Sequence, residues 1–375
     1  MKRLIAFAAA TLLLSPAFPQ KTLKGAYADA FKMGCAVNSQ IVNGRDSRSA
    51  QIILQQFNAI SPENDLKPEV IHPTPDRWNF QPGDRYVQFA QENGLWALGH
   101  TLVWHNQTPD FFFNHDDGTP KSHDEMVETM RSYIETVAGH FAGKINAWDV
   151  VNEIIDNDGS YRKTVWTNAF GDGDEIVKLA FKFAHQYAPD AELYYNDFNV
   201  WRPAKRDGIA RLVRMLQKEG IKIDGVGIQA HWGLNYPKNE YITAAIDTFA
   251  ALGVKVMITE LDIDVLPLSK EGQVIGKSLQ DPMYQLEEFE TYFDPYKNGL
   301  PDDVQAQLTA RYAELFNIFY ERRDKIDRVT IWGLHDGMSW KNGYPIPNRT
   351  NYPLLYNRDR TPKPALQAVL DIPNQ

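Results

Sequence analysis

The sequence alternates short apolar runs of β type with longer amphipathic stretches, from about residue 30 almost to its end. This alternation predicts strand–helix units. The predicted strands are residues 31–37, 59–61, 95–101, 145–151, 192–195, 225–228, 254–259 and 329–334. Helical patterns lie between them, for example at residues 125–141, 175–187, 204–219, 242–252 and 304–323. Eight such units favour one domain in which a parallel sheet closes on itself, the (β/α)8 or TIM barrel.

An open, doubly wound parallel sheet is the alternative for alternating strands and helices. That fold would normally carry a glycine-rich phosphate loop after its first strand. No such loop follows residues 31–37. Several helical patterns end at a glycine (Gly94, Gly143, Gly220 and Gly253), as helices often do. The sequence therefore favours the closed barrel.

Polar residues follow the predicted strands at their C-terminal ends, which is the face on which barrel enzymes build their sites. Two glutamates stand out, since each comes directly after an apolar run: Glu153 after residues 145–151 and Glu260 after residues 254–259. Cleavage of a glycosidic bond requires two carboxyl groups, one as proton donor and one as nucleophile or base. For the first role, Glu153 would need a raised pKa, through partial burial and repulsion by the second carboxylate.

Glu260 is followed at a spacing of two by Asp262, so in a strand both acids point to the same face. Two like charges this close need a cation or a proton donor between them. His231, at the end of the neighbouring sixth strand, is the residue expected to bridge them. A Zn or Mn site built from these three residues is the rival interpretation. The tryptophans, together with Asn152 beside Glu153, fit a sugar better, so we expect neither a metal nor another cofactor.

The overall composition excludes some partners. The formal net charge is -9 and the sequence pI is about 5.5, whereas nucleic-acid binding needs clustered cations. Aromatic residues make up 12% of the chain, including nine tryptophans, which suits the stacking of sugar rings as well as core packing.

The N-terminus has the pattern of a cleavable export signal over about residues 1–20. Lys2 and Arg3 precede an apolar run at residues 4–14, which is too short for a membrane-spanning helix, and a possible cleavage site follows near Ala17. We therefore expect a secreted or periplasmic protein without a membrane anchor, whose residues 21–375 form one catalytic domain. The single cysteine, Cys35, cannot form an internal disulfide.

Five sequence blocks, in order along the chain, resemble those of glycoside hydrolase family 10 endo-β-1,4-xylanases over nearly the whole mature length. They are residues 61–68 (SPENDLKP), 99–105 (GHTLVWH), 148–153 (WDVVNE), 227–232 (GIQAHW) and 253–263 (GVKVMITELDI). Two features differ from many relatives: the chain lacks a cysteine pair near the last strands, and it has a long polar insertion at residues 266–301, before the eighth strand. We expect the insertion to shape one end of the cleft.

The resemblance implies a role for each matching residue. Glu260 would be the nucleophile and Glu153 the acid/base of a retaining double displacement, with carboxyl groups about 5–5.5 Å apart. His231 and Asp262 would keep Glu260 ionised, and Asn152 would bond the 2-hydroxyl of the reacting sugar. The remaining predicted substrate-binding residues are Glu63, Asn64, Lys67, His100, Trp104, Gln107, Gln229, Trp332 and Trp340. Among these, Gln107 and Trp340 lie where the family excludes a hydroxymethyl group, which favours xylose over glucose.

The expected substrates are xylan and xylo-oligosaccharides. Two other functions remain open at this point: a β-1,4-glucanase on the same scaffold, and a non-catalytic barrel that binds polysaccharide. The oligomeric state and the preference among decorated xylans do not follow from the sequence.

Overall fold

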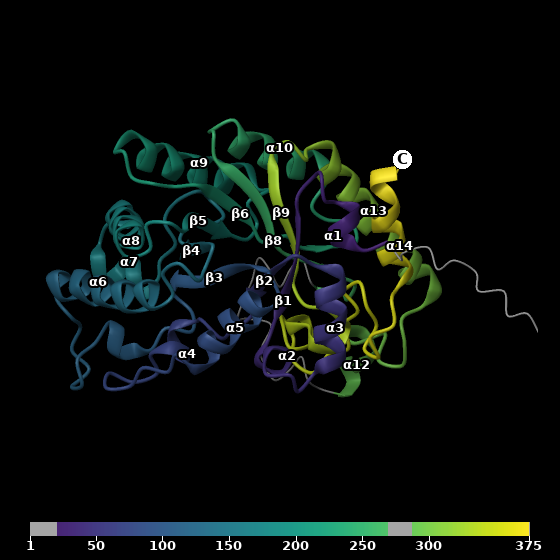
Figure 1. Ribbon diagram of the computed structural model, residues 1–375, viewed down its shortest axis with the longest axis horizontal. Coiled ribbons are helices and arrows are strands. Elements are labelled where there is room, and N and C mark those ends of the chain that lie inside the picture. The colour runs from purple at the N-terminus through teal and green to yellow at the C-terminus, as the bar shows by residue number, and fades with distance from the viewer. Residues whose placement is uncertain (1–20, 269–286, 375) are drawn as a thin grey trace, which may run out of the picture.

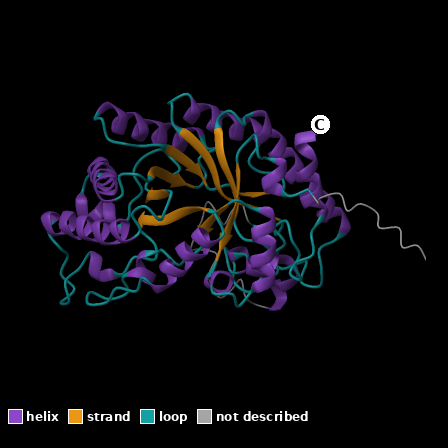
Figure 2. Ribbon diagram, viewed as in Figure 1, coloured by secondary structure: helices purple, strands orange, loops and turns teal. Residues whose placement is uncertain are grey.

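The computed structural model describes residues 21–268 and 287–374. The expected export signal, residues 1–20, lies outside the described residues, as do residues 269–286 within the predicted insertion. Strands gather at the centre of the molecule and helices surround them (Figures 1 and 2). Among the described helices, none combines the length and apolar character needed to cross a membrane.

All strand pairings in the central sheet are parallel. The order is β6-β5-β4-β3-β2-β1-β9-β8, and β8 also pairs with β6, which closes the barrel. The strands are β1 (Lys32–Val37), β2 (Ala59–Pro62), β3 (Trp96–Val103), β4 (Ala147–Asn152), β5 (Glu192–Asp197), β6 (Gly225–Ile228), β7 (His231–Gly233), β8 (Lys255–Asp264) and β9 (Ile326–Ile331). The predicted eight-stranded barrel is confirmed.

The described helices cover the outside of the barrel (Figure 2). They are α1 (Leu23–Ala26), α2 (Ser39–Val42), α3 (Ser47–Gln56), α4 (Pro68–Ile71), α5 (Gln81–Glu92), α6 (His123–His140), α7 (Val165–Phe170), α8 (Gly173–Tyr187), α9 (Pro203–Lys218), α10 (Asn239–Ala250), α12 (Glu287–Phe293), α13 (Asp302–Glu321) and α14 (Pro364–Asp371). The two ends of the described chain meet, because the Tyr27 hydroxyl, directly after α1, donates to the main-chain oxygen of Val369 in α14 over 2.7 Å.

Local sequence signals explain where several helices begin and end. Ser122 and Glu125 form a capping box at the start of α6, which satisfies main-chain N–H groups that have no partner within the helix. Gly94 after α5 and Gly253 after α10 have φ angles of 61° and 75°, a left-handed conformation that favours glycine. The amphipathic helices so defined bury their apolar faces against the strands.

One strand differs from its prediction in a way that matters for the site. The sequence predicted a strand ending at Thr259, but β8 continues to Asp264. The reason is the short extra strand β7, which the sequence did not predict: His231 pairs with Asp262, Trp232 with Ile263 and Gly233 with Asp264. Glu260 therefore lies within a strand and not after one, and its main-chain N donates to the oxygen of Gln229 over 2.9 Å.

The described end of the insertion packs on the loop that follows β9. Asp294 accepts a hydrogen bond from the main-chain N of Thr350 over 2.8 Å, and the main-chain oxygen of Tyr296 accepts one from the Tyr352 hydroxyl over 2.8 Å. Its expected effect on the cleft stays a prediction.

Candidate active site

Glu153 and Glu260 lie at the C-terminal face of the barrel, and both are buried, with 9% and 5% of their surface exposed. Glu153 follows β4 directly and has a φ of 61°, uncommon for a residue other than glycine. Its main-chain N donates to the main-chain oxygen of Asn196 over 2.9 Å, so the turn is fixed to the end of β5.

Three amide side chains connect the two carboxylates. Gln229 Nε2 donates to Glu153 Oε1 over 2.9 Å, and Asn196 Nδ2 donates to Glu260 Oε1 over 2.9 Å. Both amide nitrogens also contact the side-chain oxygen of Asn152, at 3.3 and 3.0 Å respectively. A single row of hydrogen-bonded amides thus joins the two carboxylates.

The orientation of the Asn152 amide follows from these neighbours. With its oxygen turned toward Asn196 and Gln229, it accepts from two amide nitrogens, and its own nitrogen lies 3.4 Å from Glu153 Oε1. The opposite orientation would let it donate to the main-chain oxygen of Asn196 at 3.1 Å and accept from Trp104 at 3.3 Å. That arrangement would set its NH2 against two other amide nitrogens, so we favour the first.

His231 lies between Glu260 and Asp262, as the sequence analysis expected. Its Nε2 is 3.1 Å from Glu260 Oε2 and its Nδ1 is 2.9 Å from Asp262 Oδ2. Burial alone would lower the pKa of His231, but the two carboxylates outweigh that effect and raise the pKa to about 9. His231 is therefore an imidazolium at neutral pH, and its two ring nitrogens can donate to Glu260 and to Asp262.

This contact geometry also bears on the metal interpretation. Each ring nitrogen of His231 already faces a carboxylate oxygen at hydrogen-bonding distance. A metal ligand needs a free lone pair on the imidazole, whereas a charged histidine has none. The arrangement is that of a protonated bridge between two acids.

Glu153 has an environment different from the one expected. Its Oε2 accepts a hydrogen bond from Trp104 Nε1 over 3.0 Å. Burial would raise the pKa of Glu153, but the charges of His105 and Arg162 and the hydrogen bonds from Gln229 and Trp104 together lower it. The expectation of a raised pKa is wrong, because these groups stabilise the ionised form.

Lys67 organises one side of the site. Its ammonium donates to Asn64 over 2.9 Å and to Gln107 over 2.7 Å, and lies 5.0 Å from the centre of the Trp104 ring. Burial lowers the pKa of Lys67, although the charges of Glu260 and Glu63 oppose that shift. Lys67 thus contacts Asn64, Gln107 and Trp104.

His100 and two tryptophans form further parts of the wall. His100 Nδ1 is 2.8 Å from Asp149 Oδ2, and the His100 ring lies 5.8 Å from the Trp332 ring, edge to face. The Trp340 indole N–H donates to Asp262 Oδ2 over 2.8 Å, and its ring lies 4.8 Å from that of His231. The main-chain N of Glu63, another predicted residue, donates to the oxygen of Val37 at the end of β1 over 2.9 Å.

Two residues in contact with the predicted set were not among the candidates. Asn196 donates a hydrogen bond to Glu260, and Asp149 is hydrogen-bonded to His100. The signal for Asn196 was its place at a polar strand end. Asp149 lies inside an apolar run, where the sequence offers no sign that it faces the site.

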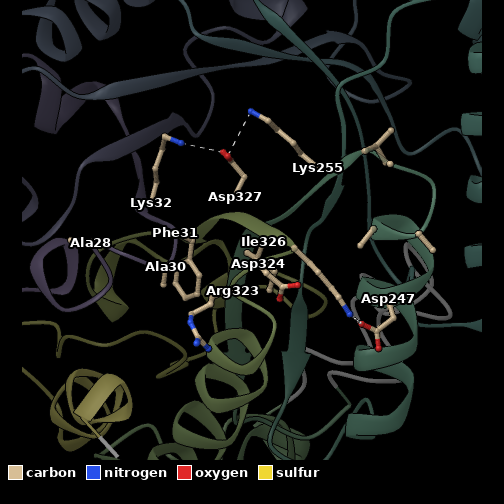
Figure 3. Close-up of a pocket in the computed structure, with 15 residues that line it drawn as sticks. Ala28, Ala30, Phe31, Lys32, Asp247, Lys255, Arg323, Asp324, Ile326 and Asp327 are labelled. Atoms are coloured by element: carbon tan, nitrogen blue, oxygen red, sulfur yellow. Dashed lines mark hydrogen bonds and ion pairs between the residues drawn. The ribbon is translucent and has the colours of Figure 1, made fainter.

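A separate hollow of about 880 Å³ opens at the opposite, N-terminal end of the barrel (Figure 3). Five of its charged residues are paired: Asp327 contacts Lys32 at 3.2 Å and Lys255 at 3.6 Å, and Lys325 contacts Asp247 at 2.6 Å. Conserved chemistry in barrel enzymes sits at the other face, and this end contributes to stability. The hollow is therefore not the site of the reaction.

Comparison with known proteins shows which family the chain resembles. The family model described as glycosyl hydrolase family 10 matches residues 22–372. Endo-1,4-beta-xylanase A of Xylanibacter ruminicola is 37% identical, over 99% of this chain and 100% of that protein.

Two solved structures also superpose on nearly the whole chain. One, titled as a novel GH10 endoxylanase retrieved from sugarcane soil metagenome, has a TM-score of 0.86 and 38% identity, over 94% of this chain and 100% of that chain. The other, a mutant structure in complex with xylotriose, has a TM-score of 0.81 and 34% identity, over 93% of this chain and 99% of that chain. On these grounds the chain belongs to glycosyl hydrolase family 10.

Proposed function

We propose that this protein cleaves internal β-1,4 bonds of xylan by a retaining double displacement, with Glu260 as nucleophile and Glu153 as acid/base. It is an endo-1,4-β-xylanase. The observation that carries the proposal is the pair of buried carboxylates joined through Gln229, Asn152 and Asn196, each in a different electrostatic environment.

In the first step, a Glu260 oxygen attacks the anomeric carbon while the glycosidic C–O bond breaks, and Glu153 gives its proton to the departing oxygen. The imidazolium of His231 donates to Glu260 Oε2 and holds the carboxylate in position for this attack. The products are a covalent glycosyl-enzyme and a shortened xylan chain with a free hydroxyl.

In the second step, water attacks the same carbon and the bond to Glu260 breaks. Glu153, now ionised, takes the proton from that water, and the hydrogen bonds from Trp104 and Gln229 stabilise its charge during this step. The lowered pKa of Glu153 suits its role as base. Its role as acid requires that bound substrate displace water from the carboxyl and raise its pKa.

The stereochemistry gives a direct test. Because two inversions retain configuration, proton NMR of early xylan hydrolysis should show the β-anomer of the new reducing end first, with the α-anomer appearing later by mutarotation. Early appearance of the α-anomer would rule out the double displacement.

The preference for xylan over glucan rests on Gln107 and Trp340 as the residues that exclude a hydroxymethyl group. The relatives named as xylanases and the xylotriose complex of one neighbour support this choice. Initial rates on xylan and on a soluble cellulose derivative should differ in favour of xylan, and faster cleavage of the glucan would reject it.

We also propose that the protein acts outside the cytoplasm, on the basis of Lys2, Arg3 and the apolar run at residues 4–14. Expression with and without residues 1–20, followed by assay of medium, periplasm and cytoplasm, tests this. Activity confined to the cytoplasm when residues 1–20 are present would refute it.

A further inference from the structure

Trp340 and Lys341 are consecutive residues in the short 3-10 helix η5 (Trp340–Asn342), and they differ in surroundings. Trp340 is partly exposed and hydrogen-bonds to Asp262, next to Glu260. Lys341 is fully buried: its side chain has 0% of its surface exposed. A lysine is almost never fully buried without a partner, so its contacts need an explanation.

The partner of Lys341 is Asp264, whose side chain is also 0% exposed, with Nζ 3.8 Å from Oδ2. The other oxygen of Asp264 is held by Asn351 Nδ2 over 2.8 Å and by the main-chain N of Leu266 over 3.0 Å. These two bonds fix the carboxylate, so that Oδ2 faces the ammonium. A second buried cation, Arg349, adds positive charge near Asp264.

Asp264 belongs to the same strand as the catalytic carboxylate. Glu260, Asp262 and Asp264 alternate along β8, so their side chains lie on one face. His231 bridges the first two, and Lys341 faces the third. The strand that carries the nucleophile therefore also anchors η5.

The Lys341 ammonium also contacts the aromatic residues of the cleft. It lies 4.6 Å from the centre of the Trp340 ring and 5.9 Å from that of Tyr344. These two rings stack on one another, with centroids 4.9 Å apart and planes at 21°. One buried cation thus contacts both rings of the stack, and a cation near an aromatic face is attracted to it.

We propose that Lys341 is a positioning residue, which through its pairing with Asp264 holds the Trp340 and Tyr344 rings in place and so enforces the preference for xylose over glucose. The inference depends on the proposed function, in which Trp340 excludes the hydroxymethyl group. Lys341 itself does not touch substrate. Without it, the stacked rings lose a contact that fixes them to β8, and the pocket beside Glu260 admits the larger sugar.

The chain contains a matched control. Lys363 and Asp336 form a second fully buried pair in the same C-terminal region, 2.7 Å apart and both 0% exposed. The Lys363 ammonium donates to the main-chain oxygen of Tyr352 and contacts neither Trp340 nor Tyr344. Loss of this lysine reports the general effect of leaving a buried carboxylate unpaired.

The test compares kcat/KM on 4-nitrophenyl β-xylobioside and on 4-nitrophenyl β-cellobioside. Lys341→Met should raise the cellobioside-to-xylobioside ratio about tenfold, the scale on which a hydrophobic pocket discriminates one small group. Lys363→Met should leave the ratio at its wild-type value. The double variant Asp264→Asn/Lys341→Met removes both charges together, which avoids an unpaired buried carboxylate, and should show the same raised ratio.

An unchanged ratio in a folded Lys341→Met protein or in the double variant would overturn the inference. Loss of a lysine that is only structural would lower kcat/KM equally on both substrates. A raised ratio in Lys363→Met as well would also overturn it. If the wild-type protein cleaved neither xylobioside nor xylan, the proposed function would fail instead, which keeps the two failures distinct.

Discussion

Asn196 donates a hydrogen bond to Glu260 Oε1 over 2.9 Å, and so joins the end of β5 to the carboxylate on β8. The Asn196 amide cannot turn freely, because its oxygen accepts from the Thr259 hydroxyl over 2.7 Å. The amide nitrogen is therefore fixed toward Glu260, and holds one of its carboxylate oxygens in place for the attack.

Replacement of Asn196 by alanine should lower kcat/KM on an aryl xylobioside about 10- to 100-fold, the usual range for a hydrogen bond to a charged group. The control is Asn93→Ala, since Asn93 lies at the surface after α5 and bonds to the main-chain oxygen of Phe89. Full activity in the Asn196→Ala protein would show that this contact does not contribute.

The two glutamates should respond differently to the leaving group. Glu260→Ala should reduce turnover by about 10⁴-fold or more on every substrate, because the covalent intermediate cannot form. Glu153→Ala should spare the first step on aryl glycosides with good leaving groups, since these need little protonation. A series of aryl xylobiosides measures the dependence, and equal losses in both variants on the most activated substrate would contradict the assignment.

The pH dependence follows from Glu153, which must be protonated to act as the acid. Its pKa is lowered in the free protein, where burial is outweighed by His105, Gln229, Arg162 and Trp104. The pH dependence of kcat/KM reports pKa values of the free enzyme. The alkaline fall of kcat/KM should therefore begin at a low pH. Bound xylan excludes water and raises the pKa, so the alkaline limb of kcat should lie at least about one pH unit higher.

Paired pH profiles of kcat and kcat/KM test this prediction, and both should be bell-shaped because one carboxyl must be ionised and the other protonated. Gln229→Ala removes a donor to the ionised Glu153, and should move the alkaline limb of kcat/KM upward. Coincident alkaline limbs in the wild-type protein would argue against a rise in pKa on binding.

The sequence was sufficient for the barrel and for the pairing of Glu260, His231 and Asp262, because both depend on local patterns. Strand periodicity placed Glu260 and Asp262 on one face, and the polar strand ends marked the face that carries the site. Strand β7 was not predicted, because a run of three residues shows no periodicity and its pairing with β8 depends on the closed barrel.

The electrostatics of Glu153 could not be predicted from its own neighbours in sequence. His105 and Arg162 lie on loops after different strands, and only the fold brings their charges near this carboxyl. The same holds for Asp149, which lies in an apolar run and is paired with His100, 49 residues away. Roles set by long-range contacts require the structure.

The His231 bridge predicts a loss of stability in mild alkali. The pKa of a free histidine is about 6.5, and that of His231 is raised to about 9 in the folded protein. The folded state thus binds more protons between these values, so the stabilisation is fully present below about pH 6.5 and is lost as the pH rises through about 9. The shift in the pKa of His231 corresponds to about 3 kcal/mol of unfolding free energy.

Urea unfolding of the wild-type protein and of His231→Asn, at about pH 6 and about pH 9.5, measures the change. The wild type should lose more stability between the two pH values than the variant does. Parallel losses would show that His231 is not the proton-linked group.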